Sequence, residues 1–290
     1  MVPQTRSKWP GRTAGLLDGG LAGLDPRHRG KSWLLLWVCC LWLAPAQAHA
    51  GEVLVAVAGN FLNPMKEVTR AFEAETGHQT AVSPGSTGKL FAQLRHGAPH
   101  EVFLAADQER PMLLEKAGLA VEGSRFTYAV GRLVLWSRHS MRPPREARQV
   151  LAQGAFRHVA IANPKTAPYG KASVQVMQKW GVWEGLRARV VQGENIAQTF
   201  QFVASGNADL GFVALSQIED PRFHGGGTRW DIPENLYESL KQDVVLLKTG
   251  RSNPAALALL SFLQSEQARA VIKRYGYRVV TEEGRSSGTE

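Results

Sequence analysis

The stretch EVLVAVAGNFLNPMKEVTRAFEAETG, residues 52–77, joins an apolar strand to an amphipathic helix through a short polar turn. Its first part is rich in valine and without charge after Glu52, which is typical of a strand covered on both faces. In its second part Met65, Val68 and Phe72 repeat at helical spacing, and Gly77 is placed to end the helix. A strand followed directly by a helix is the unit from which α/β folds are built.

The same alternation continues to the end of the chain, so the sequence predicts an α/β fold. Further strands are expected within 79–83, 100–107, 125–137, 158–164, 188–194, 208–215 and 243–250, and further helices within 87–97, 169–181, 195–206 and 253–276. The elements form two similar lobes, and the natural crossings between them are the strands around Gly131 and Val244. Residues 51–132 and 246–290 are therefore predicted to form a discontinuous first lobe, and 133–245 the second.

The first fifty residues read as a signal peptide. A basic segment, RHRGK (27–31), precedes the apolar run SWLLLWVCCLWLA, and the small residues of PAQAHA follow. We expect cleavage after Ala50 and export of residues 51–290. Because Cys39 and Cys40 are the only cysteines, the exported protein has no disulfide, no thiolate metal site and no cysteine nucleophile.

The charge of the exported part is only mildly basic. It holds 28 Lys and Arg against 23 Asp and Glu, a net charge of +5, and the basic residues are scattered. We therefore expect a solvated surface with no nucleic-acid partner. No second apolar run is long enough for a transmembrane helix.

Four loops share one design, in which a strand ends, small polar residues follow and a helix begins. Their polar positions are Gly59 and Asn60, Ser86 and Thr87, Tyr169 and Gly170, and Asn195 and Ile196. Such loops gather at the carboxyl ends of the strands, where helix N-termini offer unpaired N–H donors. Each loop alone could be an ordinary helix cap. Four facing one cleft could bind a small tetrahedral oxyanion through neutral donors.

Other sites are poorly supported by the sequence. The loop SPGSTGKL (83–90) lacks the first glycine and the hydroxyl after the lysine that a nucleotide-binding P-loop needs, and Lys89 is expected to point to water. His96 and His100 are separated by Gly97 and Pro99, which break the helix that a metal pair would require. Asp107 and Glu109 are expected to cap the next helix. We predict no enzyme, no cofactor and no direct metal-ion ligands.

In these loops the chain resembles the molybdate-binding component of bacterial ABC importers. The segments that carry the resemblance cover nearly all of the exported chain: AGNFLNPMKEVTRAFEAETGH, SPGSTGKLFAQLRHGAPHEVFLAAD, GSRFTYAVGRLVLWS, NPKTAPYGKA and GENIAQTFQFVASGNADLGFVALSQ. The resemblance implies a two-lobed periplasmic binding protein of the type II-like class, each lobe a mixed sheet flanked by helices, with the ligand cleft between them.

The resemblance also implies a ligand and a set of ligand-binding residues. The ligand would be molybdate, and tungstate too, bound by Gly59, Asn60, Ser86 or Thr87, Tyr169 and the backbone N–H of Ile196. A monomer in the periplasm would deliver it to a membrane permease driven by a separate ATPase. Two departures stand out: Gly59-Asn60 replaces a frequent Ala-Ser, and Ala214 stands where many members have tyrosine. Sulfate or an organic acid on the same scaffold is the alternative.

Overall fold

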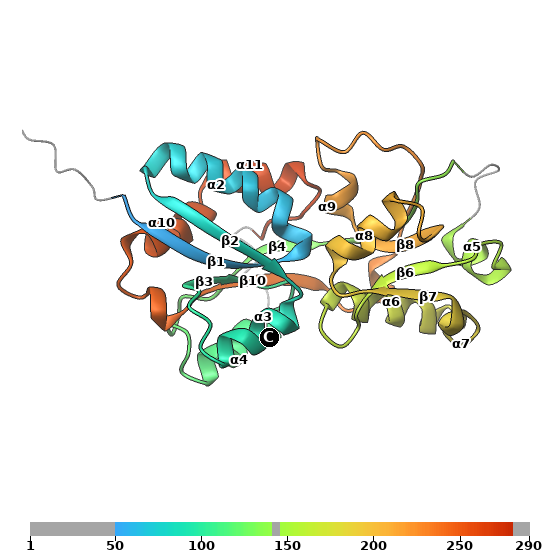
Figure 1. Cartoon of the computed structure of the whole chain (residues 1–290), viewed down its shortest axis with the longest axis horizontal. Helices are drawn as coiled ribbons and strands as arrows, with labels where there is room; N and C mark the ends of the chain where they lie inside the picture. The colour runs from blue at the N-terminus through green and yellow to red at the C-terminus, as the bar shows by residue number, and fades with distance from the viewer. Residues whose placement is uncertain (1–49, 141–145, 281–290) are drawn as a thin grey trace, which may run out of the picture. The chain divides into compact units, whose positions relative to one another are not determined.

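The computed structural model describes residues 50–140 and 146–280, so the predicted signal peptide lies, but for Ala50, outside the described residues. The described chain forms two five-stranded sheets (Figure 1). The first has the order β2 (Gln79–Gly85), β1 (Glu52–Ala58), β3 (Val102–Leu104), β10 (Leu240–Leu246), β4 (Phe126–Gly131). The second has the order β7 (Val190–Gly193), β6 (Val159–Ala162), β8 (Leu210–Ala214), β5 (Leu133–Ser137), β9 (Thr228–Asp231).

The two sheets have the same pairing pattern. In the first, β1 runs parallel to β2 and β3, whereas β10 is antiparallel to β3 and β4. In the second, β6 runs parallel to β7 and β8, whereas β5 is antiparallel to β8 and β9. The predicted α/β fold with two mixed sheets is therefore confirmed.

Helices cover both faces of the first sheet because successive strand residues point to opposite sides. Val53, Val55 and Val57 of β1 lie in one core with Phe72, and Ala56 lies in a second core with Leu90. The first core is covered by α2 (Leu62–Thr76), α10 (Pro254–Leu263) and α11 (Glu266–Arg274), and the second by α3 (Thr87–Arg95) and α4 (Glu109–Lys116) (Figure 1).

The second sheet is built in the same way. Leu133 and Leu135 of β5 face one core, and Val134 and Trp136 face the other. Helices α5 (Ala147–Gln153), α6 (Pro168–Lys179) and α7 (Trp183–Leu186) cover the first of these cores, while α8 (Ile196–Ala204) covers the second. A short helix, α9 (Leu215–Ile218), follows β8 directly.

The chain crosses between the sheets twice, and the second crossing differs from the prediction. Between β4 and β5 only Arg132 intervenes. The return lies before Leu240 and not at residue 245, because all of β10 belongs to the first sheet. The predicted boundary of the second lobe at 245 is therefore corrected: residues 240–245 belong to the first lobe.

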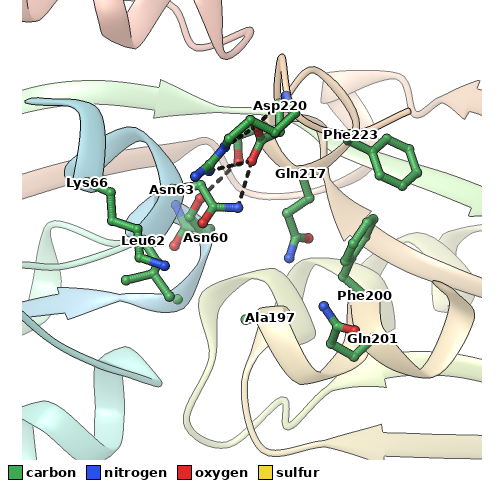
Figure 2. Close-up of a pocket in the computed structure, with 13 residues that line it drawn as sticks. Asn60, Leu62, Asn63, Lys66, Ala197, Phe200, Gln201, Gln217, Asp220 and Phe223 are labelled. Carbon is green, nitrogen blue, oxygen red and sulfur yellow. Dashed lines mark hydrogen bonds and ion pairs between the residues drawn. The ribbon is translucent and has the colours of Figure 1, made fainter. Parts of the chain in front are cut away.

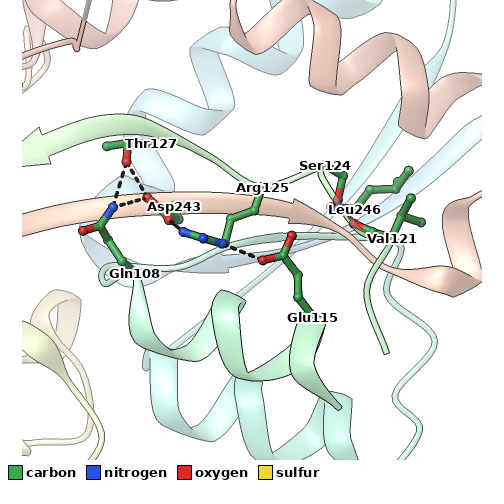
Figure 3. A network of polar contacts seen from close by, with 8 residues as sticks. All are labelled: Gln108, Glu115, Val121, Ser124, Arg125, Thr127, Asp243 and Leu246. Carbon is green, nitrogen blue, oxygen red and sulfur yellow. Dashed lines mark hydrogen bonds and ion pairs between the residues drawn. The ribbon is translucent and has the colours of Figure 1, made fainter. Parts of the chain in front are cut away.

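A buried carboxylate explains why β10 stays in the first lobe. Asp243 is completely buried, and a buried charge must be compensated by hydrogen bonds and an opposite charge. Thr127 Oγ1 and Arg125 Nη1 donate to it at 2.6 Å, and Gln108 Nε2 at 3.1 Å (Figure 3). Hydrogen bonds to Glu115 and Asp243 raise the pKa of Arg125, which keeps it charged. All these partners belong to the first lobe.

The C-terminal helix is also different from the prediction, which expected one helix over 253–276. The structure has two helices, α10 and α11, with Ser265 between them. The Ser265 hydroxyl accepts a hydrogen bond from the N–H of Ala268 and so begins α11, as Asn253 begins α10 by accepting from Ala255. No helix of the described residues is long and apolar enough to cross a membrane.

Candidate oxyanion site

The second, third and fourth polar loops meet where the two lobes touch. The N–H of Gly88, at the start of α3, donates to the carbonyl of Thr166 before α6 at 2.8 Å. Lys89 pairs with Glu194, which lies before α8. Lys89 is exposed, as expected, and its ammonium group also pairs with this carboxylate of the other lobe.

The first loop lies against the fourth. A Cβ atom built on Gly59 would lie 3.4 Å from Asn195 Oδ1 and 3.5 Å from the Cβ of Ala197. The first loop is linked to the third through Gln242, which hydrogen-bonds both Asn60 and Tyr169. Contacts therefore join all four predicted loops at one place.

In the second loop, the hydroxyls of Ser86 and Thr87 differ in their hydrogen bonding, although the sequence allowed either of them as a ligand group. Thr87 Oγ1 accepts a hydrogen bond from the N–H of Ala106 at 3.1 Å and so takes part in holding the loop. Ser86 precedes α3 at the N-cap position, yet its hydroxyl caps no N–H of the helix. Its Oγ is buried and has no hydrogen-bond partner among the described residues. Of the two hydroxyls, that of Ser86 is the one not engaged by the described residues.

Asn60 is buried, and its side chain is already engaged. Asn60 Nδ2 donates to Gln242 Oε1 at 2.8 Å and to Tyr277 Oη at 2.9 Å, which uses both of its N–H bonds. The Asn60 carbonyl accepts from Ser216 Oγ at 3.0 Å. The side chain fixes the loop, so the donor that Asn60 and Gly59 can offer a ligand is the backbone N–H.

Tyr169 lies at the start of α6 and is almost completely buried. Its hydroxyl accepts a hydrogen bond from Gln242 Nε2 at 3.2 Å. Burial, strengthened by the neighbouring Tyr277, raises the pKa of Tyr169 well above its ordinary value, so the phenol keeps its proton. Gly131 leaves the space for it, since a Cβ atom there would lie 2.1 Å from the Tyr169 hydroxyl oxygen.

The fourth loop combines a routine cap with free donors. Asn195 Oδ1 accepts from the N–H of Gln198 at 3.0 Å, as an N-cap residue does. Ile196 is the first residue of α8, and the first N–H groups of a helix have no carbonyl of the same helix to bond. The backbone N–H of Ile196 is therefore suited to a ligand, although its side chain is apolar.

Four residues of this region were missed by the sequence reasoning. Thr166 lies inside the third loop, and its Oγ1 is buried without a hydrogen-bond partner among the described residues. Gln242, Ser216 and Tyr277 bond to Asn60 from distant parts of the chain. A glutamine in an otherwise buried strand was the one available signal for Gln242.

A cleft of 480 Å³ opens beside these loops (Figure 2). Gly59, Asn60 and Ala197 are among the residues that line it, and both lobes contribute to its walls. Across it, Asn63 Nδ2 of the first lobe donates to Asp220 Oδ2 of the second at 2.7 Å (Figure 2). The cleft is far larger than a four-oxygen anion, and Ser86, Thr87 and Tyr169 do not line it.

Asp107, one of the two carboxylates considered from the sequence, has a structural role. Asp107 Oδ1 accepts from the N–H of Arg110 at 3.0 Å, and the two side chains form an ion pair, so Asp107 caps α4 as expected. Among the described residues, no group of three or more His, Cys, Asp or Glu side chains could hold a metal ion.

Known proteins resemble the chain over most of its length. Residues 53–278 match the family model described as bacterial extracellular solute-binding protein. The chain is 52% identical to the molybdate-binding protein ModA of Azotobacter vinelandii, over 81% of this chain and 93% of that protein. It is 48% identical to ModA of Rhodobacter capsulatus, over 79% and 89%.

A solved structure gives the same result for the fold. A periplasmic molybdate-binding protein of Azotobacter vinelandii superposes with a TM-score of 0.75 at 39% identity, covering 79% of this chain and all of that one. At such identities over nearly the whole length of the relatives, the relationship extends beyond a shared fold. The chain therefore belongs to the bacterial extracellular solute-binding family, in the group that contains the molybdate-binding proteins.

Proposed function

We propose that this protein captures molybdate, and also tungstate, in the periplasm and delivers it to an ABC importer. It acts as a monomer, uses no cofactor and catalyses no reaction; the partner is a membrane permease with its ATPase. Two relatives of about half identity are molybdate-binding proteins, which supports the ligand. The hinge is the pair of crossings between the lobes, through Arg132 and before Leu240.

The ligand is held by neutral donors from four loops. These are the backbone N–H groups of Gly59 and Asn60, the Ser86 hydroxyl, the Tyr169 hydroxyl and the N–H of Ile196. The single observation that carries the proposal is the buried Ser86 Oγ without a partner, since a buried polar atom is rarely left unbonded. Helix N-termini favour negative charge, so the dianion needs no cationic side chain.

Selectivity follows from size and from protonation. Molybdate, tungstate and sulfate are tetrahedral dianions, and hydrogen-bond donors alone do not separate them. A cavity sized for the larger anions leaves sulfate with stretched bonds. Phosphate carries a proton near neutral pH, and in a site that offers only donors this proton would meet no acceptor.

Calorimetric titration tests the proposal. With the purified protein in one buffer and salt, we expect one-to-one binding of molybdate and tungstate and no heat from sulfate or phosphate. Ser86→Ala should weaken molybdate binding by about 10- to 100-fold, the effect of losing one hydrogen bond to a charged group. Ser261→Ala, at an exposed serine of α10, is the control. Equal binding of sulfate and molybdate would contradict the assigned ligand.

The affinity for molybdate should not change between about pH 6 and about pH 9. Burial raises the pKa of Tyr169 above the ordinary tyrosine value of about 10, so its donating form persists across this range. The other proposed donors are backbone N–H groups and a serine hydroxyl, which do not titrate there. Calorimetry at several pH values would check this. A loss of affinity centred near pH 7 would contradict the proposed set of donors, because it would show that a group titrating near pH 7 takes part in binding.

A further inference from the structure

Gln242 occupies the centre of the contact between the lobes. It lies in β10, is completely buried, and is followed by Asp243 and a run of apolar residues. A buried amide is costly unless its groups are bonded. Gln242 Oε1 accepts from Asn60 Nδ2 at 2.8 Å and from Tyr128 Oη at 3.0 Å, and Gln242 Nε2 donates to Tyr169 Oη at 3.2 Å. One amide thus joins the first and third oxyanion loops.

The direction of these bonds decides the direction of the Tyr169 proton. An amide nitrogen only donates, so the oxygen of Tyr169 is the acceptor in its bond with Gln242. The Tyr169 hydrogen is then available to another acceptor. Because burial keeps Tyr169 protonated, this hydrogen is always present.

The neighbours of Gln242 fix which end of its amide faces Tyr169. Asn60 Nδ2 donates to Gln242 Oε1, and the Tyr128 hydroxyl shares its one hydrogen between Gln242 Oε1 and the carbonyl of Ala105, so the amide oxygen points to Asn60 and Tyr128. The pairing of β4 with β10 skips Tyr128, because Gln242 pairs with Ala129 and Asp243 with Thr127. An irregularity of this kind re-aims side chains near functional sites. Here the hydroxyl of the skipped residue contacts the amide oxygen.

We propose that Gln242 is a positioning residue that makes the Tyr169 hydroxyl a hydrogen-bond donor to the oxyanion. Gln242 touches no ligand itself. Gln242, in the first lobe, donates a hydrogen bond to the hydroxyl oxygen of Tyr169, in the second lobe. The hydroxyl hydrogen of Tyr169 is then directed to the anion when the lobes meet. This inference rests on the proposed function, because it assigns the partner of Tyr169 in the same site.

The variant Gln242→Glu tests the inference. Glutamate has nearly the same shape as glutamine, but its carboxylate oxygen replaces the N–H donor that faces the Tyr169 hydroxyl. A carboxylate still accepts from Asn60 and Tyr128, but it also accepts from Tyr169 and turns the tyrosine hydrogen away from the anion. We expect the molybdate affinity to fall by about 100-fold, since a donor is lost and a lone pair faces the anion. Tyr169→Phe alone should cost about 10- to 100-fold.

The double variant distinguishes positioning from a general effect of the new charge. Direct repulsion between a carboxylate at 242 and molybdate acts whether residue 169 is Tyr or Phe, and so cancels in a double-mutant cycle. In the Tyr169→Phe protein we expect Gln242→Glu to cost at least about 5-fold less than in the wild type. Equal losses in both backgrounds would overturn the inference. Gln175→Glu, on α6, is the matched control, because its bond from the N–H of Glu238 survives.

Two further measurements keep the outcome decisive. Thermal unfolding shows whether Gln242→Glu folds. If it does not, Gln242→Met takes its place in the same cycle, because methionine removes the N–H donor without adding charge. If the wild-type protein bound sulfate and not molybdate, this result would contradict the proposed function but not the role of Gln242. The cycle run with sulfate would still test Gln242, and additive losses would overturn its positioning role.

Discussion

Replacing Gly88 by valine should reduce the affinity for molybdate by at least about 100-fold while leaving each lobe folded. Gly88 is the second residue of α3 in the first lobe and lies against Thr166 of the second. A Cβ atom at Gly88 would lie 3.0 Å from both the Cα and the carbonyl oxygen of Thr166. These are backbone atoms that cannot rotate away, so the lobes must separate. Two or more charge-assisted hydrogen bonds would then be stretched, each contributing about 1.5–3 kcal/mol.

Calorimetry with Gly88→Val measures this effect, and thermal unfolding checks the fold. We expect the melting temperature to change little, because Gly88 belongs to neither core of the first lobe. Gly226→Val is the control, since a Cβ atom at Gly226 would meet nothing within 4 Å. If Gly88→Val bound molybdate as tightly as the wild type, the contact between Gly88 and Thr166 would not belong to the bound state.

Gly170→Ala should destabilise the second lobe by about 3 kcal/mol, at the upper end of the usual cost of overpacking. Gly170 lies in the first turn of α6, where the helix passes over the end of β6. A Cβ atom there would lie 2.2 Å from the carbonyl oxygen of Ala162 and 2.9 Å from the carbonyl carbon of Asn163. Both atoms belong to the backbone at the end of β6, so α6 must move, and Tyr169 moves with it.

Denaturant unfolding followed by circular dichroism measures this loss. A loss of about 3 kcal/mol corresponds to a melting temperature lower by about 6 °C for a chain of this size. Gly185→Ala is the matched control: Gly185 lies in α7, a Cβ atom there meets nothing within 4 Å, and alanine favours the helix. Equal stability of Gly170→Ala and the wild type would show that α6 can shift at no cost.

Most of the fold could be predicted from local patterns. The apolar run of β1 and the helical spacing of Met65, Val68 and Phe72 predict their elements, and the structure confirms them. Gly77 ends α2 in the left-handed conformation, and Asn253 caps α10. These features depend on a few consecutive residues, so the sequence carries them directly.

The errors arise where distant residues decide the outcome. The boundary at 245 was wrong because β10 is held in the first sheet by partners of Asp243 more than 100 residues earlier in the chain. The C-terminal helix was predicted as one because its apolar residues continue past Ser265, while the Ser265 hydroxyl caps a new helix there. Neither effect is visible in hydrophobic periodicity.

For the candidate site, the sequence by itself determined the four loops and their small polar residues, because each follows a strand and precedes a helix. It could not show that Thr87 Oγ1 is bonded while Ser86 Oγ is not, nor that the side chain of Asn60 is engaged. Only the tertiary structure decided these, since hydrogen-bond partners such as Gln242 and Tyr277 lie 182 and 217 residues away from Asn60. A hydrogen bond depends on distance and direction in space, which the order of residues along the chain does not contain.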